Sequence, residues 1–311
     1  MQEFLGLAYF SEVPVVLFNI QRVGPSTGMP TRSQQGDLLS CAYASHGDTK
    51  HVLLFPSTPK ECFEDSAASF DLADRLQTPV IVMSDLELGM NEQICDPLAW
   101  DDKREYDRGK VLNAEQLEEI EKFGRYLDSD KDGIPYRTLP GTHASKGSYF
   151  TRGSSHDAYA AYTEDGKVYA EVMDRLALKL RTAVEYLPEP EISSIASNKL
   201  GMIFIGTTAS AIQESLDGLS RKGIKLDTMR IRAFPFHSKV SEFIENHELC
   251  YIIDQNRDAQ LKSLLKIECN AIEEKMHSIL SYDGVLPNAQ FIEQSVLDSM
   301  QQLDESDEVP A

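Results

Sequence analysis

The sequence has 311 residues, enough for two domains, and its content of 41% hydrophobic and 26% charged residues is typical of a soluble globular protein. Its 50 acidic and 30 basic residues give a net charge of -20, which disfavours nucleic acid and anionic membrane surfaces as primary partners. No apolar run is long enough to span a bilayer, and the first residues carry acids where a signal peptide carries bases, so we expect a cytoplasmic protein.

Short apolar strands alternate with helices in the first half of the chain. After an opening helix, the pattern predicts strands at Val13–Gln21, His51–Ser57 and Pro79–Ser84. Between the last two, Thr58–Glu61 has the pattern of a capping box with proline at the first helical position. This alternation predicts a mainly parallel α/β sheet. Three strands are few for a doubly wound sheet, so this domain resembles the second part of a larger one.

A polar segment from Asn91 to about Gly166 follows these strands. It contains one predicted helix, Asn113–Leu127, and then a long irregular stretch rich in Gly, Ser, Thr and Asp. Loops of that length are usually functional or interfacial. A long amphipathic helix, Val168–Leu187, comes next, and the Pro- and Ser-rich residues 188–198 indicate a linker.

The second half of the chain repeats the alternation of strands and helices. Its predicted strands are Leu200–Ile205, Lys225–Arg232 and Leu249–Asp254, and a final helix covers Asn288–Gln302. We therefore predict an α/β protein of two domains with mainly parallel sheets. The domains are residues 1–187 and 199–303, and residues 304–311 form an acidic, disordered tail.

The segment after the first predicted strand carries the chemistry. Arg22 follows the strand directly, at the carboxyl edge where open parallel sheets bind ligands. A guanidinium group matches a carboxylate bidentately and keeps its charge when partly desolvated. The loop Gly24–Pro30 combines glycines, prolines and hydroxyls, which suits a rigid site for a small carboxylic acid. The alternative is an ordinary turn whose arginine pairs with a surface acid.

Two further patterns bear on metals. Asp128, Asp130 and Asp132 lead into Gly133 as in a calcium loop, but Leu139 stands where a bidentate glutamate is required. This pattern favours a tight Asx turn, with a weak divalent-cation site as the alternative. The five cysteines contain no CxxC spacing, so an iron–sulfur cluster in this system would lie on another chain.

Long motifs then point to a family. The run QRVGPSTGMPTRSQQGDL resembles the loop of α subunits of 2-oxoacid:ferredoxin oxidoreductases, notably the 2-oxoglutarate type. The resemblance continues through GIPYRTLPGTHASKGSYFTRGSSHD, TEDGKVY, RAFPF and DQNRDAQL, up to the acidic tail. It implies a partial pyrimidine-type domain of a thiamine-diphosphate enzyme, followed by a transketolase C-terminal-like domain. The family's carboxylate-binding arginine falls on Arg22, and its loop threonine, which meets the substrate side chain, falls on Thr31.

The resemblance also implies cofactors and partners. The expected reaction is the oxidative decarboxylation of a 2-oxoacid, preferably 2-oxoglutarate, to an acyl-coenzyme A, with electrons passed to ferredoxin. Thiamine diphosphate with Mg and a 4Fe–4S cluster would be held mainly by a β subunit, because this chain has no GDG…N motif and no ligand run of cysteines.

The chain departs from the family pattern near its start. The YPITP-like stretch and the glutamate that activates the cofactor have no counterpart, and Met1 aligns with an interior methionine. We therefore expect a fragment or split subunit whose missing N-terminal half, or a separate γ subunit, completes it. The alternative is a non-catalytic assembly partner that keeps only the substrate loop and the subunit interfaces.

Overall fold

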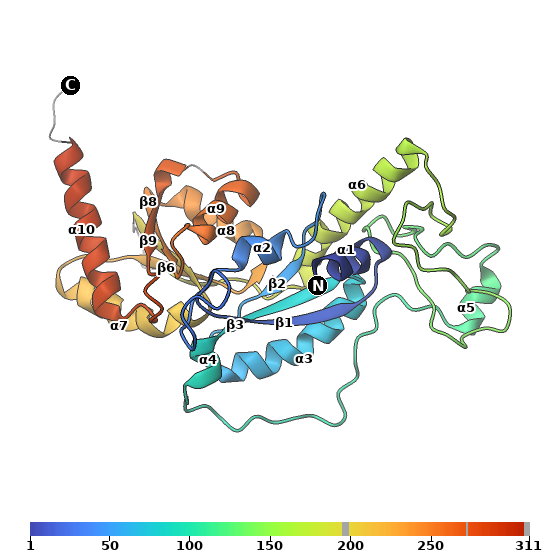
Figure 1. The fold of residues 1–311 in the computed structure, drawn as a ribbon, viewed down its shortest axis with the longest axis horizontal. Coiled ribbons are helices and arrows are strands. Elements are labelled where there is room, and N and C mark those ends of the chain that lie inside the picture. Colours follow the sequence, from blue (N-terminus) through green and yellow to red (C-terminus); the bar gives the residue numbers. More distant parts are fainter. Residues whose placement is uncertain (195–198, 272, 308–311) are drawn as a thin grey trace.

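The computed structural model describes residues 1–194, 199–271 and 273–307, which form helices around two neighbouring β-sheets (Figure 1). Within these residues no helix has the length and apolar character needed to cross a membrane. The predicted mixed α/β architecture with mainly parallel sheets is confirmed.

The first sheet has the strand order β1-β3-β2-β7. Its strands are β1 (Val15–Gln21), β3 (Pro79–Asp85), β2 (Val52–Leu54) and β7 (Ala233–Phe234). The first three run parallel, as predicted, whereas β7 is antiparallel and comes from the second half of the chain. A strand of two residues has no periodicity, so it could not be predicted from the sequence.

The second sheet has the order β4-β6-β5-β8-β9. Its strands are β4 (Glu191–Ser193), β6 (Asp227–Ile231), β5 (Leu200–Ile205), β8 (Leu249–Asp254) and β9 (Met276–Leu280). Strand β4 lies inside the predicted linker 188–198 and pairs antiparallel with β6, so this segment is not a linker throughout. The ion pair between Arg230 Nη2 and Glu191 Oε1, at 2.6 Å, helps to hold β4 there. Residues 195–198 of the linker lie outside the described residues.

Helices cover both sheets, and one of the hydrophobic core clusters joins the two sheets. They are α1 (Gln2–Ser11), α2 (Leu38–Ala42), α3 (Pro59–Leu76), α4 (Leu86–Met90), α5 (Ala114–Glu119), α6 (Gly166–Ala183), α7 (Ala209–Arg221), α8 (Ser238–Asn246), α9 (Gln260–Glu268) and α10 (Ala289–Asp307). The central core joins Leu53 and Ile81 of the first sheet to Ile203 and Ile252 of the second. Burial of these apolar side chains fixes the two sheets against each other.

The end of the chain differs from its prediction. Helix α10 continues to Asp307, past the start of the predicted disordered tail at residue 304, and residues 308–311 lie outside the described residues.

Helix α3 begins as predicted, but the side chain of Glu61 does not make the hydrogen bond that a capping box requires. Thr58 Oγ1 accepts a hydrogen bond from Glu61 N at 3.2 Å, which confirms the N-cap. The Glu61 carboxylate does not return to Thr58. It binds Arg230 of β6 through two hydrogen bonds of 2.5 and 2.9 Å. Burial opposes ionisation of Glu61, but the hydrogen bonds from Arg230 and Ser57 outweigh it and lower the pKa of Glu61 to about 2.

The predicted helix Asn113–Leu127 ends early, at Glu119. Its start is correct, because Asn113 and Gln116 form a reciprocal capping box. Beyond Glu119 the chain turns away, and Arg125 and Tyr126 become buried. Arg125 Nη2 donates to Glu12 O at 2.8 Å, and the Tyr126 N–H donates to Ala158 O at 2.9 Å. These tertiary hydrogen bonds replace the helical ones that local sequence favours.

Candidate functional site

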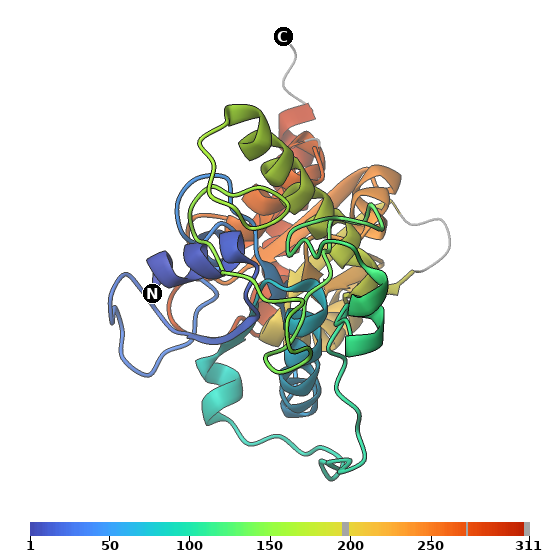
Figure 2. The ribbon, with the colours of Figure 1, turned by 90° about the vertical axis from the view of Figure 1, so that its right-hand side faces the viewer.

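The loop after β1 has a defined, closed shape. Val23 N donates to Arg32 O at 3.0 Å, and Gly24 N donates to the Gln34 side chain at 2.9 Å, so the loop returns to its own base. Gly28 has a φ of +47°, and a Cβ there would lie 2.6 Å from Val23 O. Only glycine fits this position. The loop extends outward from the molecule in Figure 2.

The base of the loop is anchored to the second sheet. The hydrogen bonds are Gln35 N to Gln255 O (2.9 Å), Asn256 Nδ2 to Gln35 O (3.0 Å), Gln260 Nε2 to Gly36 O (2.6 Å) and Leu39 N to Gln260 Oε1 (3.1 Å). Their partners lie at the carboxyl end of β8 and the start of α9. The segment DQNRDAQL therefore positions the loop. Sequence reasoning assigned no chemistry to this segment, whose signals were its place after a buried strand and its likeness to the family motif.

A buried polar cluster lies at the carboxyl ends of both sheets. Thr207 Oγ1 donates to Asp85 Oδ2 at 2.5 Å, and Gln35 Nε2 lies 3.3 Å from the same hydroxyl. Gln255 Nε2 donates to Thr208 Oγ1 at 2.8 Å. Burial raises the pKa of Asp85 above its ordinary value. Because such groups are costly to leave unpaired, this cluster ties the two sheets together directly behind the loop.

The start of α9 is held in a similar way. Asp254 ends β8 and accepts hydrogen bonds from Leu261 N at 2.8 Å and Asn256 Nδ2 at 2.9 Å. Burial of its carboxyl group raises its pKa to about 6. Asp254 thus fixes the turn that carries Asn256 and Gln260 towards the loop.

Between the loop and this turn lies a pocket of about 400 Å³. Arg22, Gln34, Asn256, Arg257 and Tyr282 are among its lining residues. Within the described part of the chain, the guanidinium group of Arg22 has no hydrogen-bond or ion-pair partner, whereas Arg257 pairs with Asp258 at 2.7 Å. A free guanidinium in a small polar pocket can bind a carboxylate. The alternative for this loop was a turn in which Arg22 pairs with a surface acid, and the described residues contain no such pair.

Thr31 does not line this pocket. It lies exposed in the loop with a φ of +57°, a strained backbone conformation for threonine. The structure therefore brings Arg22, but not Thr31, to the pocket.

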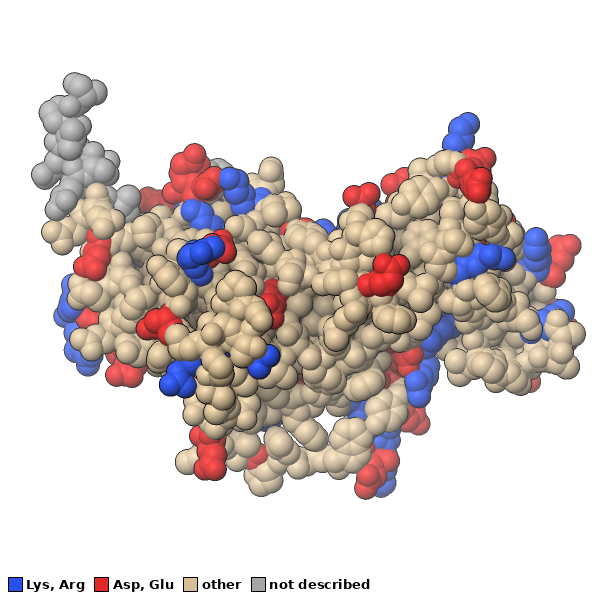
Figure 3. Space-filling model, in the orientation of Figure 1, with Lys and Arg blue, Asp and Glu red and all other residues tan. Residues whose placement is uncertain are grey.

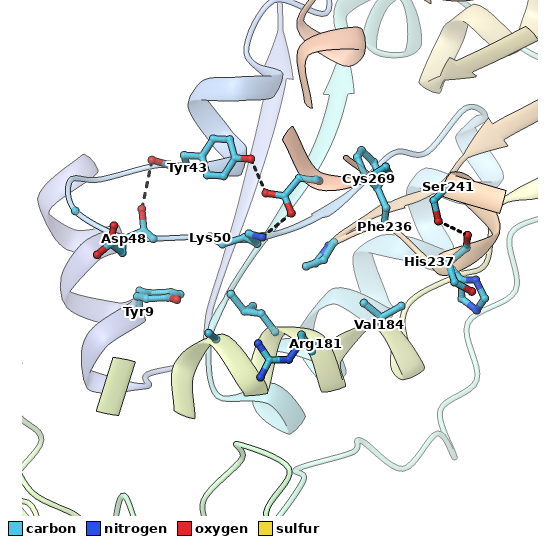
Figure 4. Close-up of a pocket in the computed structure, with 17 residues that line it drawn as sticks. Tyr9, Tyr43, Asp48, Lys50, Arg181, Val184, Phe236, His237, Ser241 and Cys269 are labelled. Atoms are coloured by element: carbon cyan, nitrogen blue, oxygen red, sulfur yellow. Dashed lines mark hydrogen bonds and ion pairs between the residues drawn. The ribbon is translucent and has the colours of Figure 1, made fainter. Parts of the chain in front are cut away.

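A larger pocket, of about 690 Å³, lies at the opposite end of the parallel strands of the first sheet (Figure 4). It surrounds Lys50, which precedes β2 and therefore marks the amino ends of the parallel strands. Glu268 pairs with Lys50 at 2.6 Å and accepts a hydrogen bond from Tyr43 at 2.5 Å. Open parallel sheets bind ligands at the carboxyl ends, so the Arg22 pocket is the better candidate site despite its smaller volume.

The aspartates Asp128, Asp130 and Asp132 form an Asx turn around a lysine. Asp128 accepts hydrogen bonds from Asp132 N and Gly133 N, while Lys110 Nζ lies 2.7 Å from Asp130 and 2.8 Å from Asp132. An ammonium group thus neutralises the carboxylates that a cation would need. The favoured Asx turn is therefore what the structure contains, and among the residues that it covers no three His, Cys, Asp or Glu side chains are grouped as the alternative cation site would require.

The two mainly parallel sheets make this an α/β protein, and the Arg22 pocket is its candidate binding site. Residues 1–136 match the family model described as "Pyruvate flavodoxin/ferredoxin oxidoreductase, thiamine diP-bdg". The chain is 35% identical over 278 residues to 2-oxoglutarate synthase subunit KorA of Archaeoglobus fulgidus, covering 86% of this chain and 68% of that protein. The chain therefore belongs to the family of 2-oxoacid:ferredoxin oxidoreductase α subunits, as its motifs predicted.

Other relatives are longer. Subunit alpha of 2-oxoacid:ferredoxin oxidoreductase 2 from Aeropyrum pernix is 30% identical over 276 residues, which is 86% of this chain but 41% of that protein. The solved structure of 2-oxoglutarate:ferredoxin oxidoreductase from Magnetococcus marinus has the same fold, with a TM-score of 0.79 and 22% identity. That match covers 96% of this chain and 50% of the other. The chain thus spans about half the length of these proteins.

Proposed function

We propose that this chain supplies the oxoacid-binding part of the α subunit of a 2-oxoacid:ferredoxin oxidoreductase. The observation that carries the proposal is the Arg22 guanidinium, which lacks a partner among the described residues and lines a pocket at the carboxyl end of β1. It would bind the carboxylate of the substrate and orient the keto carbon, which is a positioning role and not a proton transfer.

The proposed reaction consumes a 2-oxoacid and coenzyme A and releases carbon dioxide, an acyl-coenzyme A and the proton of the coenzyme A thiol. Two electrons leave one at a time, and ferredoxin accepts them. We prefer 2-oxoglutarate as substrate, because the Archaeoglobus relative is named for 2-oxoglutarate and the Magnetococcus structure contains it. Pyruvate and branched-chain 2-oxoacids are the competing substrates.

The cofactors would be shared with a β subunit. Thiamine diphosphate would supply the electron sink for decarboxylation, and the match of residues 1–136 to a thiamine-diphosphate-binding model supports its presence in the complex. The sequence has no GDG…N motif for a diphosphate-bound Mg and no ligand run of cysteines for a 4Fe–4S cluster. We therefore assign both groups to the β subunit. We also propose that the complex is cytoplasmic.

The alternative, a non-catalytic assembly partner, explains the binding loop less well. A non-catalytic partner would need its subunit interfaces, but it would not need an unpaired arginine. It would also not need Gly28, which lets the loop backbone pass close to Val23, next to Arg22. Besides the β subunit and ferredoxin, we propose as a partner either a separate γ subunit or the further part that the longer α subunits contain.

Reconstitution with the β subunit tests the proposal. We expect the complex to reduce ferredoxin only when thiamine diphosphate, coenzyme A and a 2-oxoacid are all present, with the highest kcat/KM for 2-oxoglutarate. The measurement is ferredoxin reduction followed by absorbance, with the β subunit alone as control. A complex that assembles but reduces ferredoxin with none of the 2-oxoacids would favour the assembly-partner alternative.

Thr31→Ala is expected to change which 2-oxoacid is preferred while leaving the complex active. The reason is that Thr31 is exposed in the same closed loop as Arg22, where a bound partner could bring it to the substrate side chain. Loss of one hydrogen bond should alter the ratio of kcat/KM for 2-oxoglutarate and pyruvate about 3- to 10-fold. Thr27→Ala, in the same exposed loop, is the matched control. An unchanged ratio in the Thr31 variant would remove its assigned role.

A further inference from the structure

The larger pocket, of about 690 Å³, has no role in the proposed reaction. Small-molecule sites have volumes of about 300–1,000 Å³ and often lie where two domains meet. The walls of this pocket come from segments on both sides of strand β4: Lys50 and Arg181 precede that strand in the chain, and Phe236 and Cys269 follow it. No described residue lines both this pocket and the pocket of Arg22. It is therefore a separate candidate ligand site.

One cation of this pocket is unpaired. Lys50 Nζ pairs with Glu268 Oε2 at 2.6 Å, and the same glutamate accepts a hydrogen bond from Tyr43. Arg181, in the last turn of α6, has no hydrogen-bond or ion-pair partner within the part of the chain that the structure describes. Burial raises the pKa of the Cys269 thiol to about 12, so this side chain adds no charge. The guanidinium group of Arg181 is thus available to bind an anion.

One face of α6 places Arg181 next to apolar side chains. Ala177, Arg181 and Val184 all line the pocket, at positions that recur along one face of a helix. In Figure 4, Arg181 and Val184 lie on the α6 side of the pocket, and Phe236, from the turn between β7 and α8, lies across from them. The pocket thus offers a guanidinium group for an anionic head and apolar walls for the body of a ligand.

The charges around the pocket indicate the kind of anion. With Lys50 and Glu268 paired, the charged side chains that remain in the described lining are Arg181 and Asp48, with histidine counted as neutral. The chain carries a net charge of -20, and acidic and basic side chains are interspersed on the face seen in Figure 3, so a polyanion is disfavoured. A single carboxylate, in contrast, matches a single guanidinium group bidentately.

We propose that this pocket binds a small monocarboxylic acid with an apolar body. Its carboxylate would bind Arg181, and its body would lie against Val184 and Phe236. Such an acid would contact α6 and the turn after β7 at the same time, and it would therefore stabilise the packing of these two segments. The inference does not depend on the catalytic proposal, because it concerns a different pocket and a different arginine.

Calorimetry with three probes tests this site on the unmodified chain. Phenylacetate has both a carboxylate and an apolar body, acetate has only the carboxylate, and phenethyl alcohol has only the body. We expect a Kd of about 1 mM or lower for phenylacetate, and binding at least about 10-fold weaker for the other two probes. The thermal midpoint should rise with the concentration of phenylacetate. No binding of phenylacetate at millimolar concentration, or equal binding of phenethyl alcohol, would overturn the proposal.

Two variants separate this pocket from the pocket of Arg22. Arg181→Ala should weaken phenylacetate binding at least about 10-fold, since it removes the guanidinium group. Because Arg181 is exposed and has no partner among the described residues, the variant without ligand should keep the thermal midpoint of the parent chain. Arg22→Ala is the matched control, because it removes the unpaired arginine of the other pocket and should leave phenylacetate binding unchanged. Full binding by Arg181→Ala would contradict the proposal, and loss of binding in Arg22→Ala instead would place the acid in the other pocket.

Discussion

Arg22→Ala is expected to lower kcat/KM for the 2-oxoacid sharply in ferredoxin reduction by the reconstituted complex, chiefly through a higher KM. Two charge-assisted hydrogen bonds to a carboxylate would be lost, which corresponds to a fall in kcat/KM of about 100- to 1000-fold. We expect Arg22 to contribute nothing to the stability of the fold, because its side chain is exposed and has no partner in the described residues. The thermal midpoint of the variant should therefore equal that of the parent chain.

Two controls sharpen this expectation. Arg22→Lys keeps the charge but loses the bidentate geometry, so it should recover part of the activity through a raised KM. Arg221→Ala removes an exposed arginine at the end of α7 and should leave the kinetics unchanged. If Arg22→Ala left the KM for the oxoacid unchanged and lowered only kcat, the carboxylate-binding role would be wrong.

Glu12→Ala is expected to lower the free energy of unfolding by about 3–5 kcal/mol, because it leaves buried cations without their partner. The Glu12 carboxylate is completely buried and binds Arg175 at 2.5 Å and Lys179 at 3.0 Å. Lys179 is itself buried and donates to Gln77 O at 3.1 Å. This cluster joins the end of α1 to α6 and to the turn that precedes β3. Denaturant unfolding measures the effect.

The pH dependence of the free energy of unfolding tests the same cluster independently. Burial opposes ionisation of Glu12, but Lys179 and Arg175 outweigh it and lower the pKa of Glu12 to about 2, from 4.5 in an unfolded chain. The stabilisation is therefore complete above about pH 4.5 and is lost as the pH falls towards 2. The exposed pair Lys199–Glu248 is the matched control, and Glu248→Ala should change stability little. A Glu12→Ala protein as stable as the parent would show that the buried pairs contribute nothing.

Part of the candidate site could be predicted because its signals are local. Arg22 follows an apolar strand, and the glycines and prolines after it exclude a continued strand or helix, so a ligand loop was predictable from contiguous residues. The N-caps at Thr58 and Asn113 were predictable for the same reason. Caps and turns depend on residues three or four positions apart.

Other features depend on residues that the sequence does not place together. The partner of the aspartates of residues 128–132 is Lys110, which lies outside the motif. The end of α5 was decided by hydrogen bonds from Arg125 and Tyr126 to distant backbone. In both cases a partner supplied by the fold replaced the one that the local pattern indicated.

The sequence by itself determined the alternation of strands and helices, the arginine loop and the family. Only the tertiary structure decided how that loop is held: Asn256 binds Gln35 across 221 residues, and Gln260 binds Gly36 across 224. It also decided that β1 is an outer strand of the first sheet, within the described residues, and that β7 crosses into that sheet. The physical reason is that periodicity, capping and turn chemistry act between near neighbours. Strand pairing and buried polar contacts, in contrast, depend on which distant surfaces the shared core brings together.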